Sequence, residues 1–469
     1  MGNPEDGVMV PRAEDFFCGS VPKEITSTSP VIPERERSKE PLYKTLSVPI
    51  STQIEVTQSC NLLCRHCYNY WRGESSSTPS TLDREHLFQT LEELDRYKIF
   101  RVTFTGGEPL LHKDLVIEAI RWATARKIDC AVNSNLTTVS EEDAFALKES
   151  GVQAILVSLI SFDEETHDRI TQRRGSFKKT VKGIRNVLTA RIPLMVHTVV
   201  SQANRDQVYE TGRFVANLGV KAFAATKVSP TLGVPHFSEY GLSKEMTKQS
   251  LEALLKLRED FALQTDILEC YPLCLIGDAQ RFTQFVKRSC SAGTTTMVIG
   301  ANGDIRPCIH SNEVSGNIFK EGLKEAWMRM NRWRDGSLIP QVCHECEYLR
   351  ECSAGCRVEA QYFGDISGMD PYASSPQDVI VPSSIKSFEF LVDERFFERR
   401  LKINPNLRMR EENFGGIVTG GSSYIFLNED SYTLIKSLKD SPSLVAELSQ
   451  NYNVDREQAL TFFTHLLKS

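Results

Sequence analysis

Three cysteines, Cys60, Cys64 and Cys67, follow one another in the spacing CxxxCxxC, just after an apolar alternating run, Val48–Thr57. Cysteine thiolates hold iron–sulfur clusters, and four of them close the ligation of an ordinary [4Fe–4S] electron carrier. Three thiols therefore hold three irons of a cubane and leave the fourth iron open to an outside ligand, such as an amino and carboxylate pair. A zinc site without its fourth ligand and a set of buried thiols are the alternatives.

A second motif, Gly106-Gly107-Glu108-Pro109, follows the predicted strand Arg101–Thr105 about forty residues later. Two glycines allow a backbone to pass close to a ligand. Glu108 offers an acceptor to an ammonium group, and Pro109 ends the strand. By itself the motif is also compatible with a plain turn.

Together the two motifs resemble those of the radical S-adenosylmethionine (radical SAM) family, in which an aromatic residue, here Tyr68, lies beside the last cysteine. The resemblance implies a [4Fe–4S] cluster on the three cysteines. It also implies that the GGEP motif clasps the amino group of S-adenosylmethionine (SAM). Relatives place polar strand-end groups against the ribose, and Asn135 and Ser158 hold those positions here. Ordinary strand-end polarity explains these two residues about equally well.

The chain departs from the family where relatives bind the SAM carboxylate. Ile160-Ser161 stands where many relatives have Asp-Gly, and Thr171-Gln172 stands where they often have Arg-Gly. Arg173 is the nearest basic residue to that position. The sequence therefore leaves the carboxylate contact unassigned, and it identifies no catalytic acid or base.

The elements around these motifs alternate between strand-like and helical patterns, which favours an α/β fold with a parallel sheet and helices outside. A first helix is predicted after a capping-box start at Ser80, because Leu87, Leu91 and Leu94 recur at helical spacing. Further helices are predicted at Asp114–Arg126, Ser140–Ser150, Ser176–Thr189 and Asn204–Leu218. The predicted strands are Ile50–Thr57, Arg101–Thr105, Asp129–Asn133, Ala154–Leu159, Leu194–Val200 and Lys221–Thr226. Six such strands make a partial (β/α)6 barrel, as the radical SAM resemblance also implies, with ligands at the carboxyl ends of the strands. Cys130 lies inside a strand and is interpreted as a core residue.

A second set of cysteines begins near residue 265: Cys270, Cys274, Cys290, Cys308, Cys343, Cys346, Cys352 and Cys356. The last four are spaced closely enough for a local metal knuckle, including a zinc site. Gly303 precedes Cys308 by five residues, in a predicted hairpin turn. The whole series resembles the SPASM domain, which carries two auxiliary iron–sulfur clusters in radical SAM enzymes that modify peptides.

The SPASM resemblance implies a ligand set for each auxiliary cluster. The first would use Cys290, Cys308, Cys356 and either Cys270 or Cys274, between which the sequence does not choose. The second would use Cys343, Cys346 and Cys352. Relatives complete that cluster with a last cysteine after an Asp-Pro pair, but no cysteine follows Cys356 here. Asp370 is the expected oxygen ligand in its place, unless the iron stays open.

The C-terminal segment begins near Phe388, after a linker at residues 373–385 that is rich in Ser and Pro. Its predicted elements are strands at Leu407–Met409, Gly416–Thr419 and Ser423–Leu427, then helices at Glu429–Leu438, Ser443–Tyr452 and Asp455–Leu467. This winged-helix pattern resembles the PqqD-like module, which takes the leader of a precursor peptide as an added strand. A structural cap and a DNA-binding winged helix are the alternatives, and the lack of a Lys and Arg run in the last helix favours a peptide.

The length of 469 residues predicts several domains. We expect an irregular tail at residues 1–45, the barrel at 46–260, the SPASM domain at 261–375 and the PqqD-like domain at 388–469. A net charge of -6 gives no global attraction for nucleic acid or anionic lipid, and no apolar run is long enough to span a bilayer. Thirteen cysteines at metal-like spacings fit a reducing cytoplasm better than a disulfide scaffold.

The resemblances imply an oxidoreductase-type enzyme that reductively cleaves SAM to a 5′-deoxyadenosyl radical. That radical would modify a ribosomally made precursor peptide, forming a thioether or carbon–carbon crosslink or a related oxidation. The implied partners are the leader of that peptide and an electron donor such as flavodoxin or ferredoxin. One alternative is an anaerobic sulfatase-type maturase that oxidises a protein segment. The non-enzyme alternative is a zinc-binding winged-helix regulator.

Overall fold

The computed structural model describes residues 23–25, 42–73, 79–232, 237–286, 288–379, 400–401, 407–420, 424–440 and 443–444. Two compact units contain them. The larger is built on Val48–Val381, and the smaller combines Val21–Ser47 with Pro382–Ser469. Cys18 and the helix expected at Asp455–Leu467 lie outside the described residues.

A ten-stranded sheet forms the centre of the larger unit, in the order β11-β10-β9-β2-β3-β4-β5-β6-β7-β8. Its strands are β2 (Ser51–Thr57), β3 (Arg101–Gly106), β4 (Asp129–Ser134), β5 (Ala154–Ser158), β6 (Leu194–Val200), β7 (Ala222–Lys227), β8 (Gln264–Asp266), β9 (Thr296–Ile299), β10 (Asp304–Arg306) and β11 (Gly316–Asn317). Neighbours from β2 to β7 pair in parallel. These six strands confirm the predicted parallel sheet and agree with the predicted bounds to within one residue at each end.

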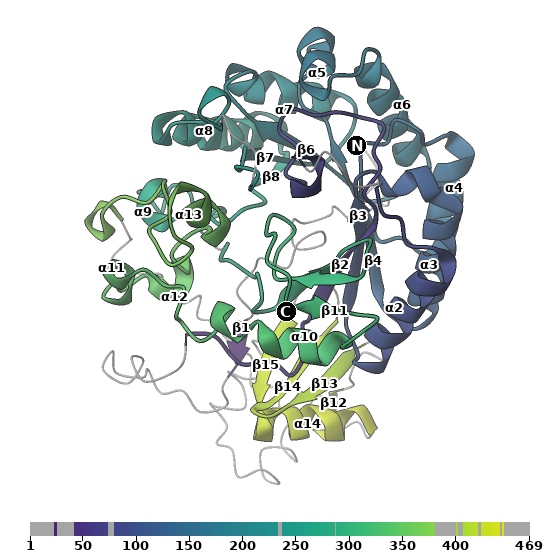
Figure 1. Cartoon of the computed structure of the whole chain (residues 1–469), viewed down its shortest axis with the longest axis vertical. Helices are drawn as coiled ribbons and strands as arrows, with labels where there is room; N and C mark the ends of the chain where they lie inside the picture. The colour runs from purple at the N-terminus through teal and green to yellow at the C-terminus, as the bar shows by residue number, and fades with distance from the viewer. Residues whose placement is uncertain are drawn as a thin grey trace. The chain divides into compact units, whose positions relative to one another are not determined.

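Seven helices lie in an arc outside these strands (Figure 1). They are α2 (Arg84–Arg96), α3 (Lys113–Ala125), α4 (Glu141–Ser150), α5 (Glu164–Thr171), α6 (Ser176–Thr189), α7 (Val208–Asn217) and α8 (Lys244–Phe261). Leu87, Leu91 and Leu94 of α2 are fully buried, as their helical spacing predicts. The predicted capping box at Ser80 is wrong, because α2 begins at Arg84 and the Asp83 carboxylate caps it. No helix among the described residues is both long enough and apolar enough to cross a membrane.

The sheet does not stop at the barrel boundary expected at residue 260. Strand β9 pairs in parallel with β2, and β9 and β10 form the hairpin predicted around Gly303. The buried Arg306 guanidinium lies 2.5 Å from the Glu55 carboxylate, which ties β10 to β2. The first SPASM strands thus extend the barrel sheet. The remaining helices of this unit are α9 (Leu273–Ile276), α10 (Leu323–Arg329), α11 (Gln341–His344), α12 (Leu349–Cys352) and α13 (Arg357–Phe363).

Short 3-10 helices complete the larger unit. They are η2 (Tyr70–Gly73), η3 (Pro109–His112), η4 (Arg205–Gln207), η5 (Phe237–Glu239), η6 (Asn331–Trp333) and η7 (Pro376–Asp378).

The smaller unit contains a four-stranded sheet in the order β1-β15-β14-β13, with β14 antiparallel to both of its neighbours. Its elements are β1 (Lys23–Ile25), β13 (Arg408–Glu412), β14 (Gly415–Thr419), β15 (Tyr424–Asn428), α14 (Glu429–Asp440) and a separate pair, β12 (Arg400–Leu401) with β16 (Ser443–Leu444). The three predicted strands and the first predicted helix are confirmed.

One expectation for this unit is wrong and another gains a detail. Within the tail expected at residues 1–45, Lys23–Ile25 pair in parallel with β15. Ser443–Leu444 form a strand, although a helix was expected to begin there. Both differences arise from pairing with strands remote in sequence, which a local pattern does not encode.

Candidate functional site

The loop that carries the first three cysteines follows β2 and is fixed by α5. The backbone N–H groups of Leu63 and Arg65 donate to the carbonyls of Thr171 and Ile170, in each case at 3.0 Å. These carbonyls belong to the last turn of α5, where helix carbonyls have no partner within the helix. The short helix that the sequence did not reveal therefore positions the cysteine loop.

The three thiols lie close enough for their charges to interact. Burial and then the charges of Cys67 and Cys60 raise the pKa of the Cys64 thiol to about 12. Because iron binds thiolate, such a site needs positive charge nearby to stay deprotonated. Arg72 supplies it: its guanidinium hydrogen-bonds Cys67 and donates to the Leu62 carbonyl at 2.6 Å. Arg72 was not predicted as a site residue. Its position five residues after Cys67 is the one feature of the sequence that indicates it.

The GGEP turn is hydrogen-bonded to the residues that lead into the cysteine loop. The Gly107 N–H donates to the Thr57 carbonyl at 2.6 Å, and the Glu108 N–H donates to the Ser59 carbonyl at 2.8 Å. A Cβ at Gly107 would lie 2.1 Å from the Ser59 carbonyl oxygen, which is far inside contact distance. The second glycine thus permits the approach of two backbone segments, so both motifs form one structure.

Glu108 fastens this turn to the end of β4. Its buried carboxylate accepts hydrogen bonds from the Leu110 N–H at 3.0 Å, the Ser134 hydroxyl at 2.7 Å and the Asn135 N–H at 2.7 Å. Burial raises the pKa of Glu108, and the three donors act against that increase. A carboxylate has about four acceptor positions, so one remains for an ammonium group.

The structure brings Asn135 to the cysteine loop. Its amide nitrogen donates to Asn61 Oδ1 at 2.8 Å and lies 3.9 Å from the Cys60 sulfur. Ser158 ends β5, half-buried and in register with His197 of β6. Both residues are therefore at the carboxyl end of the sheet, and Asn135 is the closer to the thiols.

The structure also brings Tyr68 and Arg173 to this loop. The Tyr68 ring stacks on His310 with centroids 4.7 Å apart, and its hydroxyl hydrogen-bonds Thr105. Arg173 Nε donates to the Asn61 carbonyl at 3.2 Å, so this guanidinium contacts the loop itself.

A buried charge cluster near the end of β7 was not found from the sequence. The Lys227 ammonium, 1% exposed, contacts the carboxylates of Glu269 and Glu359, and the Ser229 hydroxyl contacts both carboxylates as well. Burial, followed by repulsion from Glu269, raises the pKa of Glu359 to about 8. Because Glu269 precedes Cys270, this cluster lies beside the auxiliary cysteines. In the sequence, the feature that indicates this cluster is Lys227, which directly follows the predicted strand Lys221–Thr226.

The later cysteines separate into two groups. In the first, the Cys270 thiol hydrogen-bonds the thiols of both Cys290 and Cys356, which raises its pKa. Cys308 is close enough for Cys356 and Cys290 to raise its own pKa, after burial, to about 12. These four thiols include the three that the SPASM pattern assigns to its first cluster, and Cys270 completes the group.

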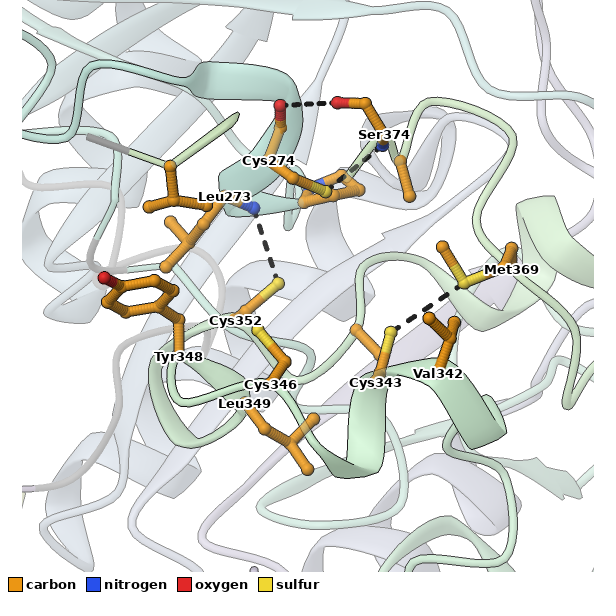
Figure 2. Close-up of a pocket in the computed structure, with 14 residues that line it drawn as sticks. Leu273, Cys274, Val342, Cys343, Cys346, Tyr348, Leu349, Cys352, Met369 and Ser374 are labelled. Carbon is orange, nitrogen blue, oxygen red and sulfur yellow. Dashed lines mark hydrogen bonds between the residues drawn. The ribbon is translucent and has the colours of Figure 1, made fainter. Parts of the chain in front are cut away.

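The second group lines one pocket and consists of Cys274, Cys343, Cys346 and Cys352 (Figure 2). The pocket encloses about 440 Å³ of space, part of it open to solvent. Asp370 is not among its lining residues. Among the described residues, no three Cys, His, Asp or Glu side chains converge tightly enough to chelate a single metal ion. All four thiols line this one space, and thiolates are the ligands that hold iron–sulfur clusters.

Two family models match the chain in these regions. Residues 54–215 match the Radical SAM superfamily, and residues 290–347 match the SPASM iron–sulfur cluster-binding domain. The first match spans the cysteine loop and the GGEP turn, and the second contains four cysteines, two from each of the later groups. These domains imply a [4Fe–4S] cluster that binds SAM, together with auxiliary clusters.

Two curated relatives cover most of the larger unit's length. An AdoMet-dependent heme synthase from Oleidesulfovibrio alaskensis is 27% identical over 327 residues, covering 65% of this chain and 81% of the relative. The mycofactocin maturase MftC from Mycolicibacterium smegmatis is 26% identical over 357 residues, covering 74% of this chain and 87% of the relative.

Solved structures share the fold at low sequence identity. The enzyme anSMEcpe, with bound AdoMet and Cp18Cys peptide, superposes with a TM-score of 0.55 at 20% identity, covering 69% of this chain and 93% of that chain. Streptococcus suis SuiB bound to the precursor peptide SuiA gives a TM-score of 0.53 at 18% identity, covering 69% and 75%. With its cysteine loop, its GGEP turn and these two matches, the chain carries a domain that matches the Radical SAM superfamily and a domain that matches the SPASM family.

Proposed function

We propose that this enzyme reductively cleaves SAM and modifies a ribosomally made precursor peptide. The product would be a thioether or carbon–carbon crosslink, or a related oxidation. One observation carries the SAM half of the proposal. Hydrogen bonds from Gly107 and Glu108 to Thr57 and Ser59 hold an amino-binding turn directly against a three-thiol loop. When bound, the reduced cluster supplies one electron to SAM, which yields a 5′-deoxyadenosyl radical.

Each residue of this site has a role in the proposal. Cys60, Cys64 and Cys67 would hold the SAM-binding cluster, and Arg72 would offset the charge of their thiolates. Glu108 positions the turn with three acceptor bonds and keeps one acceptor site for the SAM ammonium. Asn135 orients the loop through Asn61.

The peptide half of the proposal rests on the relatives and on the smaller unit. MftC is a maturase of mycofactocin, and SuiB was solved with a precursor peptide. In the smaller unit, three antiparallel strands precede α14, as in the PqqD-like pattern. Its β15 edge accepts an added strand, since β1 pairs with it at three positions. A leader peptide would bind this edge in place of Lys23–Ile25, forming the same kind of main-chain hydrogen bonds.

The proposal includes two further partners of the reaction. A flavodoxin or ferredoxin would reduce the SAM-binding cluster, and the auxiliary clusters would accept the electron left after the peptide radical closes on a neighbouring group. A reducing cytoplasm fits this chemistry, because cluster ligands must be reduced thiols.

The SAM half is tested by replacing Cys60, Cys64 and Cys67 together with alanine. The anaerobically reconstituted wild-type enzyme should form 5′-deoxyadenosine when dithionite is added, and the triple variant should form none. Replacing Cys130, a buried β4 residue, with alanine is the matched control and should preserve the yield. Normal cleavage by the triple variant would overturn the proposal.

The peptide half is tested by co-expression with short reading frames that neighbour the gene. Mass spectrometry of each peptide should show a loss of hydrogens that requires both the enzyme and the peptide's leader. Equal modification of the leaderless core would contradict the role given to the smaller unit. The heme synthase relatives give a porphyrin as the second candidate substrate. Oxidation of an added porphyrin, with no peptide changed, would select it, whereas oxidation of a Cys or Ser in a folded protein would select sulfatase-type maturation.

A further inference from the structure

We infer that Cys274 is the fourth protein ligand of the second auxiliary cluster. The inference rests on the proposed function in one respect, because it takes the SPASM cysteines to be cluster ligands. The sequence pattern of relatives would supply this ligand from downstream of Cys356, where this chain has no cysteine. In this chain a thiol from upstream takes that place.

The pocket of Figure 2 brings Cys274 together with the three thiols whose cluster lacks a fourth protein ligand. Cys274, Cys343, Cys346 and Cys352 all line it. Cys274 is also near enough for its charge to act on each of the other three. Two of the four come from α9 and α12, and the other two flank the end of α11, so elements remote in sequence converge on one space.

Backbone donors point at two of these sulfurs. The Ser374 N–H donates to the Cys274 sulfur at 3.2 Å, and the Leu273 N–H donates to the Cys352 sulfur at 3.4 Å. The Ser374 hydroxyl also donates to the Cys274 carbonyl at 2.7 Å, so Ser374 holds both the side chain and the backbone of Cys274. Hydrogen bonds to ligand sulfurs are a means by which proteins stabilise iron–sulfur clusters and set their potentials. The site therefore has supporting contacts as well as ligands.

The other upstream thiol is already engaged. Cys270 hydrogen-bonds Cys290 and Cys356, which places it in the first group. Pro272 lies between the two cysteines as the N-cap of α9, and Cys274 is on that helix. Cys270 and Cys274 therefore contact different thiols although only four positions separate them in sequence. This difference resolves the choice that the sequence left open.

Each carboxylate oxygen of Asp370, the expected oxygen ligand, accepts one backbone hydrogen bond. One accepts from the Cys356 N–H at 2.7 Å and the other from the Tyr372 N–H at 2.8 Å. Asp370 is 2% exposed, and one of its oxygens would lie 2.4 Å from a Cβ placed on Gly355. It therefore stabilises the loop around Cys356, in the first group. Its charge also acts on Cys343, but its side chain does not line the second pocket.

Met369 provides the remaining sulfur at this pocket. Its thioether lies 3.8 Å from the Cys343 sulfur. A thioether is neutral, whereas the ligands of iron–sulfur clusters are thiolates. Met369 is therefore a neighbour of the site and offers a matched control variant.

The experiment uses full-length protein in the Cys60→Ala, Cys64→Ala, Cys67→Ala background, so that only auxiliary clusters contribute. Iron analysis should give about eight irons per chain in this background. Adding Cys274→Ala should remove between one and about four of these irons, and mild oxidation should produce the electron paramagnetic resonance signal of a three-iron cluster. Met369→Leu and Asp370→Asn should retain about eight irons and the parent spectrum.

Several results would overturn the inference. Full iron with an unchanged spectrum in Cys274→Ala would exclude Cys274, and a loss of iron in Asp370→Asn confined to the second cluster would restore the oxygen ligand. Stoichiometric zinc in this pocket would exclude the cluster. If Cys274→Ala does not fold, Cys274→Ser tests the same point, because an oxygen ligand should retain iron and shift the cluster's potential, and an unchanged potential would contradict us.

Failure of this inference is distinguishable from failure of the proposed function. Absence of 5′-deoxyadenosine from wild-type enzyme would refute SAM cleavage, whatever the iron content. Normal SAM cleavage with an iron content insensitive to Cys274 would refute the ligand assignment alone.

Discussion

The Lys227 ammonium lies 3.1 Å from the Glu269 carboxylate, and it also contacts Glu359. Lys227 and Glu359 are buried, and Glu269 is largely buried. One ammonium therefore serves two carboxylates. His310 lies 3.7 Å from Glu269, but burial lowers its pKa, so the cluster balances when one carboxyl group holds a proton. The raised pKa of Glu359, about 8, identifies that group. The arrangement depends on every member, because an isolated buried charge is costly.

We predict that Lys227→Met destabilises the protein by about 3–5 kcal/mol, since it leaves the Glu269 carboxylate beside the buried Glu359 carboxyl without its cation. Thermal unfolding followed by circular dichroism measures the effect. Lys256→Met is the control: Lys256 pairs with Asp260 at 2.6 Å but is 60% exposed. That change should leave the unfolding midpoint almost unchanged, because water and salt screen an exposed pair. Equal losses in both variants would show that burial of the cluster has no energetic consequence.

Glu359→Gln should change how stability depends on pH. The folded-state pKa of about 8 exceeds the ordinary value of 4.5, so the folded protein retains a proton that the unfolded chain releases. The stability that Glu359 contributes is therefore present below pH 4.5 and is lost as pH rises toward 8. The difference amounts to roughly 1.4 kcal/mol per pKa unit. Glutamine keeps the shape of the protonated group and cannot release a proton.

The measurement compares unfolding midpoints of wild type and Glu359→Gln at pH 6 and pH 9. The variant should match wild type more closely at the lower pH and exceed it at the higher one. A constant difference across this range would mean that Glu359 does not titrate there.

Gly107→Ala should disrupt the site without removing any ligand. Its Cβ would lie 2.1 Å from the Ser59 carbonyl, so the GGEP turn must move away from the cysteine loop. A displacement of about 1 Å costs on the order of 100-fold in rate, and we expect that loss in 5′-deoxyadenosine formation. Gly420→Ala is the control, because its nearest contact, with Leu407, lies at an ordinary 3.5 Å. Comparable activity of the two variants would contradict the role given to Gly107.

Arg72→Met should lower the reduction potential of the SAM-binding cluster, because it removes a positive charge next to the cluster's thiolates. We expect a shift on the order of tens of millivolts, with slower SAM cleavage. Redox titration followed by electron paramagnetic resonance measures the potential. Arg65→Met alters an exposed residue of the same loop and should leave the potential unchanged. An equal shift of the reduction potential in both variants would contradict a local role of Arg72 and would indicate a long-range charge effect.

The pairing of β1 with β15 predicts a measurable protection of the β15 backbone. Replacing Glu24 and Ile25 with proline removes adjacent N–H groups, one of which must face β15 in a parallel ladder. Hydrogen exchange at Tyr424–Asn428 should then accelerate by at least about tenfold at the exposed edge positions, while β14 stays protected. Unchanged exchange would show that Lys23–Ile25 do not hold this edge, and a leader would then bind it without displacing them.

The spacing of residues in the sequence predicted the larger unit well. Six parallel strands were found because each combines an apolar run with a following helix, and the two motifs lie at the carboxyl ends of β2 and β3 as expected. Helix α5 was missed because its eight residues, Glu164–Thr171, are mostly polar and too few to show a period. The roles of Arg72, Lys227 and Glu359 depend on side chains that meet only in the folded chain.

The division of the later cysteines into two groups could be predicted only in part from the sequence. Spacing identified eight thiols and a missing ligand, yet it could not separate Cys270 from Cys274, because both satisfy the same pattern. In the folded chain, α9 carries Cys274 into the pocket with Cys343, Cys346 and Cys352, whereas Cys270 contacts Cys290 and Cys356. In the smaller unit, no local pattern indicates that Lys23–Ile25 pair with a strand four hundred residues later.

If Cys274 completes the second cluster, every thiol of both auxiliary groups precedes residue 357. During translation, all the ligands of these clusters would leave the ribosome before most of the smaller unit has been synthesised. A chain that needs a downstream cysteine must instead wait for that residue before its cluster site can close. Iron delivery to this enzyme could thus begin on the nascent chain, and later changes to its C-terminal segment would be free of any constraint from the metal sites.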